Sequence, residues 1–144
     1  QIPMMMEQTP DRTNSIRIGE SKCRLGMPKV VIDYQISNQD KERLWRTLEI
    51  VGQEFGALSV GRLQLLKERA SRIWTNQLGF SNHHMGGTRM SGTPEYGVVD
   101  SNQLVFGTKN LYITGSSVFP TGGHVPPTLT IVALTIRLAG YLSQ

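Results

Sequence analysis

Residues 81–90 read SNHHMGGTRM, and residues 114–130 read TGSSVFPTGGHVPPTLT. These two glycine-rich stretches contain all 3 histidines of the chain, with His83 and His84 adjacent in the first and His124 in the second. Each stretch borders a strongly apolar run, which predicts a loop held between rigid elements, where functional side chains usually lie. A histidine in such a loop can accept a proton near neutral pH. The two stretches are therefore the first candidates for a functional site.

The composition is that of a globular chain, and its 144 residues form one ordinary domain or a piece of a larger one. The net charge is +4, and the basic residues of the first third show no aromatic interleaving and no zinc-finger, RRM or homeodomain pattern, so nucleic-acid binding is not predicted. The single cysteine, Cys23, excludes a fold built on internal disulfides, and no apolar stretch is long enough to span a bilayer. The start at Gln1, without a signal-like segment, predicts a fragment of a larger protein.

The first half of the chain predicts two strands and a helix. Residues 1–14 are polar and contain prolines, and we expect them to link to upstream structure. The segments Ser15–Gly19 and Lys29–Ile36 are predicted strands, because apolar residues alternate with polar ones in the second. Ser37, with Asp40 three residues later, predicts the start of a helix. The apolar stripe of this helix would consist of Leu44, Leu48, Val51 and Phe55.

The second half predicts short strands followed by an apolar helix. Residues 62–78 are compatible with a short strand plus a turn or a helix. The three short strands predicted after the first histidine stretch are Val98–Asp100, Leu104–Phe106 and Leu111–Ile113. Residues 129–142 have apolar side chains on nearly every face, which is typical of a helix buried against other structure. A chain this short does not supply that structure, so we expect partner structure outside it.

Several kinds of chemistry can be weighed at the two stretches. Zinc is not predicted, because adjacent histidine side chains tend to diverge and no Cys-x-x-Cys or His-Glu-x-x-His occurs. A serine hydrolase is not predicted either, because residues 115–118 lack the second glycine of the turn that holds a serine nucleophile. His83 or His84 can take a proton from a hydroxyl group, although a structural role remains the alternative. Thr128 can cap the last helix, whose N-terminus either attracts an electron-rich group or is an ordinary capped turn.

At these residues the chain resembles the C-terminal part of the glucose–methanol–choline (GMC) oxidoreductase family, over roughly residues 7–143. The motifs that carry the resemblance are GMPKV (26–30), HHMGGTRM (83–90), GVVD (97–100), GSSVFPT (115–121) and PTLTIVAL (127–134). The resemblance implies an α+β fold with a mainly antiparallel sheet and packed helices, plus a C-terminal strand and helix of an FAD-binding domain. Residues 1–97 would be the substrate-domain portion that carries the histidine loop, and residues 98–144 the closing segment of the FAD-binding domain.

The family oxidises alcohols with FAD, so the resemblance implies an oxidoreductase that acts on the CH–OH group of a small alcohol or sugar. A histidine would remove the hydroxyl proton while the carbinol carbon transfers a hydride to the flavin N5. His83 takes the catalytic position when Gly86 and Met90 are in register with the family motif. Counting the motif from Gly87 instead selects His84. We prefer His83, because two motif residues then match.

Two residues depart from the family pattern. Gly87 stands where the family usually has threonine, and Pro126 stands where many members place the second active-site residue, an asparagine or a histidine. A proline side chain neither donates nor accepts a hydrogen bond. His124, two residues earlier, is the candidate for this second catalytic position. The Pro126 departure also favours an alternative function, a non-catalytic binding or structural protein built on a degenerate GMC-like fold.

FAD is the cofactor that the resemblance implies, and no metal is predicted. Gly115 and Ser116 are expected near its ribityl and phosphate portion, and Pro127 and Thr128 near its isoalloxazine ring. No Gly-x-Gly-x-x-Gly follows a strand in this sequence, although that fingerprint would hold the FAD pyrophosphate. We therefore expect the fingerprint in a missing N-terminal FAD-binding region of the same chain. Without that region the fragment is expected to be inactive.

Overall fold

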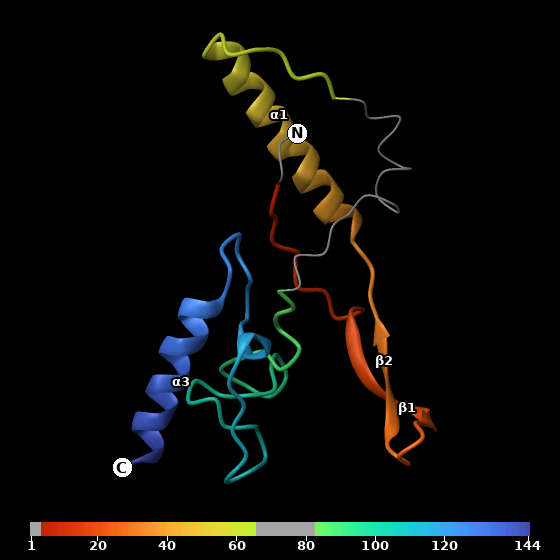
Figure 1. Ribbon diagram of the computed structural model, residues 1–144, viewed down its shortest axis with the longest axis vertical. Helices are drawn as coiled ribbons and strands as arrows, with labels where there is room; N and C mark the ends of the chain where they lie inside the picture. The colour runs from red at the N-terminus through yellow and green to blue at the C-terminus, as the bar shows by residue number, and fades with distance from the viewer. Residues whose placement is uncertain (1–3, 66–82) are drawn as a thin grey trace. The chain divides into compact units, whose positions relative to one another are not determined.

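The computed structural model describes residues 4–65 and 83–144, which fall in two compact units (Figure 1). The first unit comprises Gln1–Gln35 and Asn82–Gln144, and the second comprises Ile36–Ser81. The elements in chain order are β1 (Ser15–Lys22), β2 (Pro28–Asp33), α1 (Asn38–Ala57), the 3₁₀ turn η1 (Ser116–Val118) and α3 (Thr128–Leu142). An antiparallel strand pair together with helices confirms the predicted α+β class. The prediction for residues 62–78, a short strand plus a turn or a helix, falls outside the described residues from residue 66 on.

Strands β1 and β2, at the two predicted strand segments, form an antiparallel hairpin, although β1 extends to Lys22 and β2 ends already at Asp33. Its turn is closed by the Cys23 N–H, which donates to the Met27 carbonyl at 2.8 Å. Gly26 within that turn has φ +78°, a backbone conformation that glycine adopts without steric cost. Glycine at this position therefore lets the chain reverse between the two strands.

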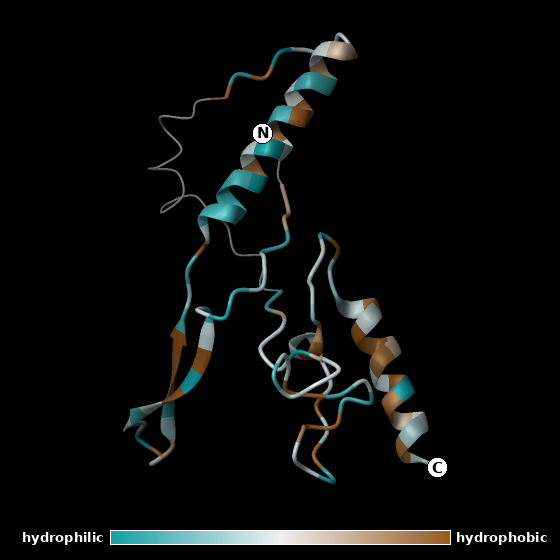
Figure 2. Ribbon diagram, turned by 180° about the vertical axis from the view of Figure 1, so that it is seen from behind, coloured by the Kyte–Doolittle hydropathy of each residue, from teal (hydrophilic) through white to brown (hydrophobic). Residues whose placement is uncertain are grey.

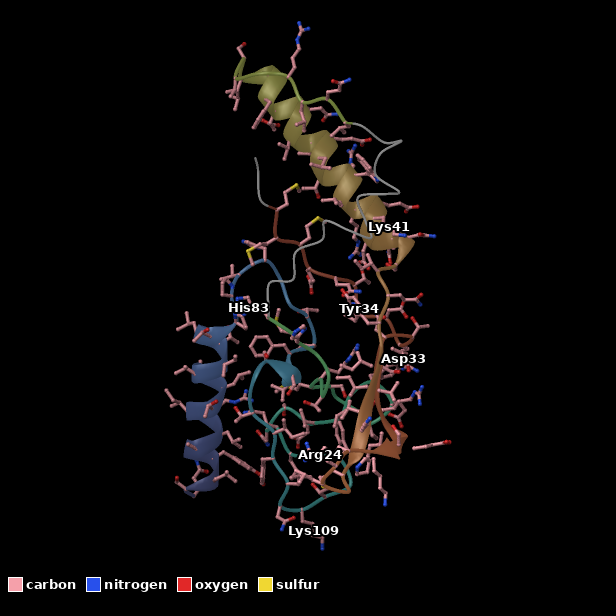
Figure 3. The ribbon with its side chains drawn as sticks, turned by 45° about the vertical axis from the view of Figure 1, so that its right-hand side comes forward. Arg24, Asp33, Tyr34, Lys41, His83 and Lys109 are labelled. Carbon is pink, nitrogen blue, oxygen red and sulfur yellow. The ribbon has the colours of Figure 1, made fainter. Side chains whose placement is uncertain are left out.

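The hairpin carries an apolar face. Ile16 lies opposite Ile32 and Ile18 lies opposite Val30, and directly opposite residues project to the same side of the pair. All four side chains are exposed, from 63% for Ile16 to 77% for Ile18, and the brown ribbon of the hairpin in Figure 2 marks its hydrophobic residues. On the other face the Arg17 Nε lies 3.0 Å from the carboxylate of Asp33, which Figure 3 labels. Within the described residues, nothing buries the apolar side of this two-stranded sheet.

Helix α1 begins with the predicted capping box. The Asp40 N–H donates to Ser37 Oγ at 3.1 Å, and the Ser37 N–H donates back to the Asp40 carboxylate at 3.2 Å. These reciprocal bonds satisfy two amides that a helix start otherwise leaves without partners. The side chains of the predicted apolar stripe are half-buried, namely Leu44, Leu48, Val51 and Phe55. The sequence pattern therefore located the start of α1 and four side chains that are partly buried.

The small core of the first unit lies between its loops and α3. Val99, Val118 and Phe119 are buried, and the side chains packed around them are Met85, Met90, Val105, Ile113, Ile131 and Leu134. The three predicted short strands are present only as isolated bridges that join Val99 to Met90 and Val105, and Leu104 to Tyr112. Turns at Gln103 (φ 67°) and Gly107 (φ 78°) separate these segments after very few residues, so continuous strands do not form.

Helix α3 starts differently from the prediction, because Pro127 and not Thr128 is its N-cap. The Pro127 carbonyl accepts the Ile131 N–H at 3.0 Å, so Thr128 is already the first helical residue and makes no cap bond with its side chain. One side of α3 packs on the core, while Leu129 is 82% and Ile136 67% exposed. Of the described helices, none is long and apolar enough to cross a membrane.

Candidate functional site

Two loops of the first unit are joined along their backbones, and we call residues 83–90 the first loop and residues 114–127 the second loop. Three amides of the first loop donate to three successive carbonyls of η1 in the second. The pairs are Gly86 with Ser116 at 3.3 Å, Thr88 with Ser117 at 2.9 Å and Met90 with Val118 at 2.8 Å. We call these three bonds the loop ladder. It fixes the loop of His83 and His84 against the segment that leads to His124 and α3.

Side-chain hydroxyls strengthen this junction. Ser116 Oγ donates to the His84 carbonyl at 2.8 Å, and Thr88 Oγ1 donates to Ser117 Oγ at 2.8 Å. A serine hydroxyl has one hydrogen to donate, so the side chain of Ser116 retains only acceptor capacity for any further partner. The first loop is thus held on both sides of its glycine pair.

Glycine permits close approach at two points of the junction. Gly86 has φ +82°, and a Cβ atom added there would lie 3.4 Å from the Phe119 carbonyl oxygen. A Cβ atom added at Gly122 would lie 3.0 Å from the Met85 methyl group. Met85 follows the histidine pair, and Gly122 lies two residues before His124. The packing therefore brings the neighbourhoods of both histidine positions together.

The imidazoles of His83, His84 and His124 are exposed in the described structure (Figure 3 labels His83). Exposure leaves each ring open to a substrate hydroxyl, which a proton acceptor must reach within hydrogen-bond distance. Gly123, with φ +70°, directly precedes His124 and lets the backbone turn there. The arrangement supplies histidines on two loops that are tied to each other.

The residues expected at the cofactor lie at the start and at the end of the second loop. Gly115 has φ +122°, and an added Cβ atom would meet nothing within 4 Å. Pro127 is buried, whereas Thr128 is exposed in the first turn of α3. The first-turn amides have no side-chain cap, and such a helix N-terminus attracts an electron-rich group.

Other titratable groups of the described chain do not form a second centre. Across residues 4–65 and 83–144, no three His, Cys, Asp or Glu side chains are grouped so that they could hold a metal ion. A hydrogen bond from the Thr93 side chain holds the pKa of the exposed Glu95 carboxyl below its usual range. Glu95 lies outside both loops, in the turn that follows the first one.

Sequence reasoning missed Glu7, which lies in the segment expected only to link upstream. Its Oε1 accepts the N–H of Gly122 in the second loop at 2.7 Å, across 115 positions of sequence. Neither periodicity nor a local motif signals a contact over such a separation.

Comparison with known proteins identifies the family. The model of GMC oxidoreductase, for the C-terminal part of that family, matches residues 10–135. Cholesterol oxidase of Acinetobacter baumannii is 43% identical over 63 residues, which are 44% of this chain and 11% of the relative. 2-Methyl-1,2-propanediol dehydrogenase of Mycolicibacterium austroafricanum is 27% identical over 147 aligned positions, which cover 98% of this chain and 24% of the relative.

A third relative is similar over nearly the whole chain. It is 6'''-hydroxyparomomycin C oxidase of Streptomyces lividus, 31% identical over 141 positions that cover 94% of this chain and 24% of the relative. The chain therefore spans about a quarter or less of the length of these relatives. Their names are those of oxidases and a dehydrogenase, and their family is generally FAD-dependent. Because the family match covers most of its residues, this chain belongs to the GMC oxidoreductase family and represents the C-terminal region of such a protein.

Proposed function

We propose that this chain, joined to the remaining length that its relatives have, forms an FAD-dependent oxidoreductase that oxidises a small alcohol or sugar at a CH–OH group. We call that protein the full-length protein. The observation that carries the proposal is the loop ladder, since it ties the first loop, with its two histidines, to the segment that leads into α3. In this proposal residues 1–97 belong to the substrate domain and residues 98–144 close the FAD-binding domain.

His83 is the proposed base. The family motif places a glycine three residues after the catalytic histidine, and Gly86 has φ +82° whereas Gly87 takes no positive φ. A position that needs this backbone conformation excludes most side chains, which supports Gly86 as the motif glycine and His83 as its partner. His83 would take the hydroxyl proton and hold it, and the alkoxide character that results eases loss of hydride from the adjacent carbon. Bound FAD would supply the hydride acceptor.

His124 is proposed for the second catalytic position. Pro126, at the family position for that residue, offers no hydrogen-bonding side-chain atom, while the glycines before His124 allow its loop to adjust. At the cofactor, Gly115 and Ser116 would contribute backbone groups near the ribityl and phosphate portion. The uncapped first turn of α3, after Pro127 and at Thr128, would face the electron-rich end of the ring.

The test uses the full-length protein and its flavin absorption. Rapid mixing with candidate alcohols and sugars under anaerobic conditions gives the rate of flavin bleaching. His83→Ala is expected to lower this rate by about 10²-fold or more, because a positioned base contributes on the order of 10²–10⁴-fold. His84→Ala is the matched control and is expected to cost much less. The opposite order would assign the base to His84.

Pro126 supports the alternative, a non-catalytic binding or structural protein, because a proline offers no hydrogen-bonding side-chain atom at the second catalytic position. A protein that lost the second polar residue can retain the fold while it loses oxidation. A correctly folded full-length protein that is colourless, and that binds no flavin when FAD is added, would favour this alternative over the oxidoreductase.

A further inference from the structure

We propose that Glu7 is a positioning residue that anchors the second loop, beside His124, against the first loop. The anchor itself follows from contacts within the first unit, and its effect on the reaction rests on the proposed function. The hydrogen bond of Glu7 is to the Gly122 N–H, so we assign its action on the site to that residue.

The contact joins three separate segments of the chain. Glu7 Oε1 accepts the Gly122 N–H at 2.7 Å, a distance typical of a hydrogen bond to an ionised group. A Cβ atom at Gly122 would lie 3.9 Å from Glu7 Cγ and 3.0 Å from the Met85 methyl group. The N-terminal segment, the first loop and the second loop therefore meet at one residue.

An anchor is physically needed at this place. Gly122 and Gly123 stand side by side before His124, and glycine loses more conformational freedom on ordering than any other residue. Without an external bond, this part of the second loop would sample many conformations. A charge-assisted bond to the first of the two glycines restricts the backbone directly before the imidazole.

The segment that carries Glu7 is itself held in the first unit. Gln8 Nε2 donates to the Gln35 carbonyl at 3.0 Å. Arg12 donates to the Glu95 carbonyl at 3.0 Å, and its guanidinium lies 5.5 Å from the centre of the Tyr96 ring. The segment that carries Glu7 is therefore held to the first unit by contacts of Gln8 and Arg12 as well.

A catalytic consequence follows if the proposed function holds. The second loop sets where the His124 imidazole lies and where the first turn of α3 faces the ring. Loss of the anchor should act on the reacting geometry more than on substrate capture, because positioned groups contribute mainly to the chemical step. The signature is a fall in the rate at saturating substrate with little change in KM.

The experiment compares Glu7→Ala, Glu7→Gln and Glu20→Ala in the full-length protein. The glutamine variant keeps an oxygen that can accept the Gly122 N–H without the charge. Glu20, an exposed glutamate on β1, is the matched control for loss of a carboxylate. Hydrogen exchange, read by mass spectrometry on peptides that cover residue 122, reports the anchor without any catalysis. Flavin bleaching, normalised to bound flavin, reports the rate.

We expect Glu7→Ala to speed exchange at residue 122 by about tenfold or more, as loss of a charge-assisted bond implies. The bleaching rate at saturation should fall by about tenfold and KM should change less than about threefold. Glu7→Gln should recover much of both losses, and Glu20→Ala should match the wild type. Unchanged exchange in Glu7→Ala, or a glutamine variant as impaired as the alanine variant, would overturn the inference.

A purely structural role has a different outcome. In that case Glu7→Ala would unfold at a lower temperature, while exchange at residue 122 and the rate per bound flavin would equal those of the wild type, and the proposal would fail. If the wild type oxidises no alcohol or sugar, the proposed function fails instead. The hydrogen-exchange measurement at residue 122 then tests by itself whether Glu7 anchors the second loop.

Discussion

Replacement of Gly86 by alanine tests how strictly the first loop depends on its backbone conformation. Gly86 has φ +82°, and its N–H donates the first bond of the loop ladder, to the Ser116 carbonyl at 3.3 Å. A side chain at such a φ costs about 1–2 kcal/mol. The added Cβ atom would lie 3.4 Å from the Phe119 carbonyl oxygen, which is close to ordinary contact and adds little. A cost of about 1–2 kcal/mol lowers the ratio of molecules with an intact ladder to molecules with an open ladder by about 5- to 30-fold.

Hydrogen exchange is the direct assay, because the amides of Gly86, Thr88 and Met90 are the donors of the ladder. Peptides that cover these amides in the full-length protein should exchange about 5- to 30-fold faster in Gly86→Ala than in the wild type. Flavin bleaching by substrate should slow in the same variant, since the first loop then spends less time in its docked form.

Two other glycines provide matched controls. A Cβ atom at Gly87 would meet the Ile16 side chain at an ordinary 3.5 Å, and one at Gly92 would meet nothing within 4 Å. Alanine at either position should change stability by no more than about 0.5 kcal/mol. If the amides of the loop ladder exchange no faster in Gly86→Ala than in these control variants, the ladder does not depend on the left-handed backbone conformation of residue 86. A larger effect at Gly87 would shift the motif register to His84.

Three further predictions concern the second loop and the fragment. Ser116→Ala should slow flavin bleaching by about 2- to 10-fold, because it removes the hydrogen bond from Ser116 Oγ to the His84 carbonyl. Ser143→Ala removes a bond of the same 2.8 Å length at the end of α3 and should leave the bleaching rate unchanged. Equal bleaching rates in the two variants would argue against a role of the Ser116 bond. Pro126→Asn should leave the bleaching rate unchanged or raise it, while His124→Ala should lower it if His124 holds the second position; a structure with FAD in which His124 lies far from N5 would exclude that role. Residues 1–144 expressed alone should aggregate or pack loosely, because the apolar residues of α3 remain partly uncovered; a sharp thermal transition of a soluble monomer would contradict this.

Local chemistry made part of the fold predictable. The Ser37–Asp40 capping box and the alternation in β2 each depend on neighbours within a few residues, and both appear in the structure. The prediction that Thr128 caps the last helix was wrong, because Thr128 is the first residue of α3 and Pro127 is its N-cap. The Pro127 carbonyl accepts the first helical hydrogen bond.

For the site, the sequence predicted the two loops and the candidate residues but not the contacts between the loops. The glycine-rich composition identified both loops, and the family motif selected His83 among the histidines. The ladder between the loops could not be derived, because backbone bonds between positions about thirty residues apart leave no trace in side-chain periodicity. The same holds for Glu7, whose partner is 115 positions away. Long-range pairing of loops depends on the whole fold, which the sequence pattern does not encode locally.

The discontinuity of the first unit has a consequence for biosynthesis. Gln1–Gln35 belongs with Asn82–Gln144, and all of Ile36–Ser81 is made between them. At about 5–20 residues per second, Gly122 leaves the ribosome on the order of ten seconds after Gln35. During that interval the β1–β2 hairpin exists without the second half of its own unit. The contact between Glu7 and Gly122 can therefore form only after the second loop has been synthesised.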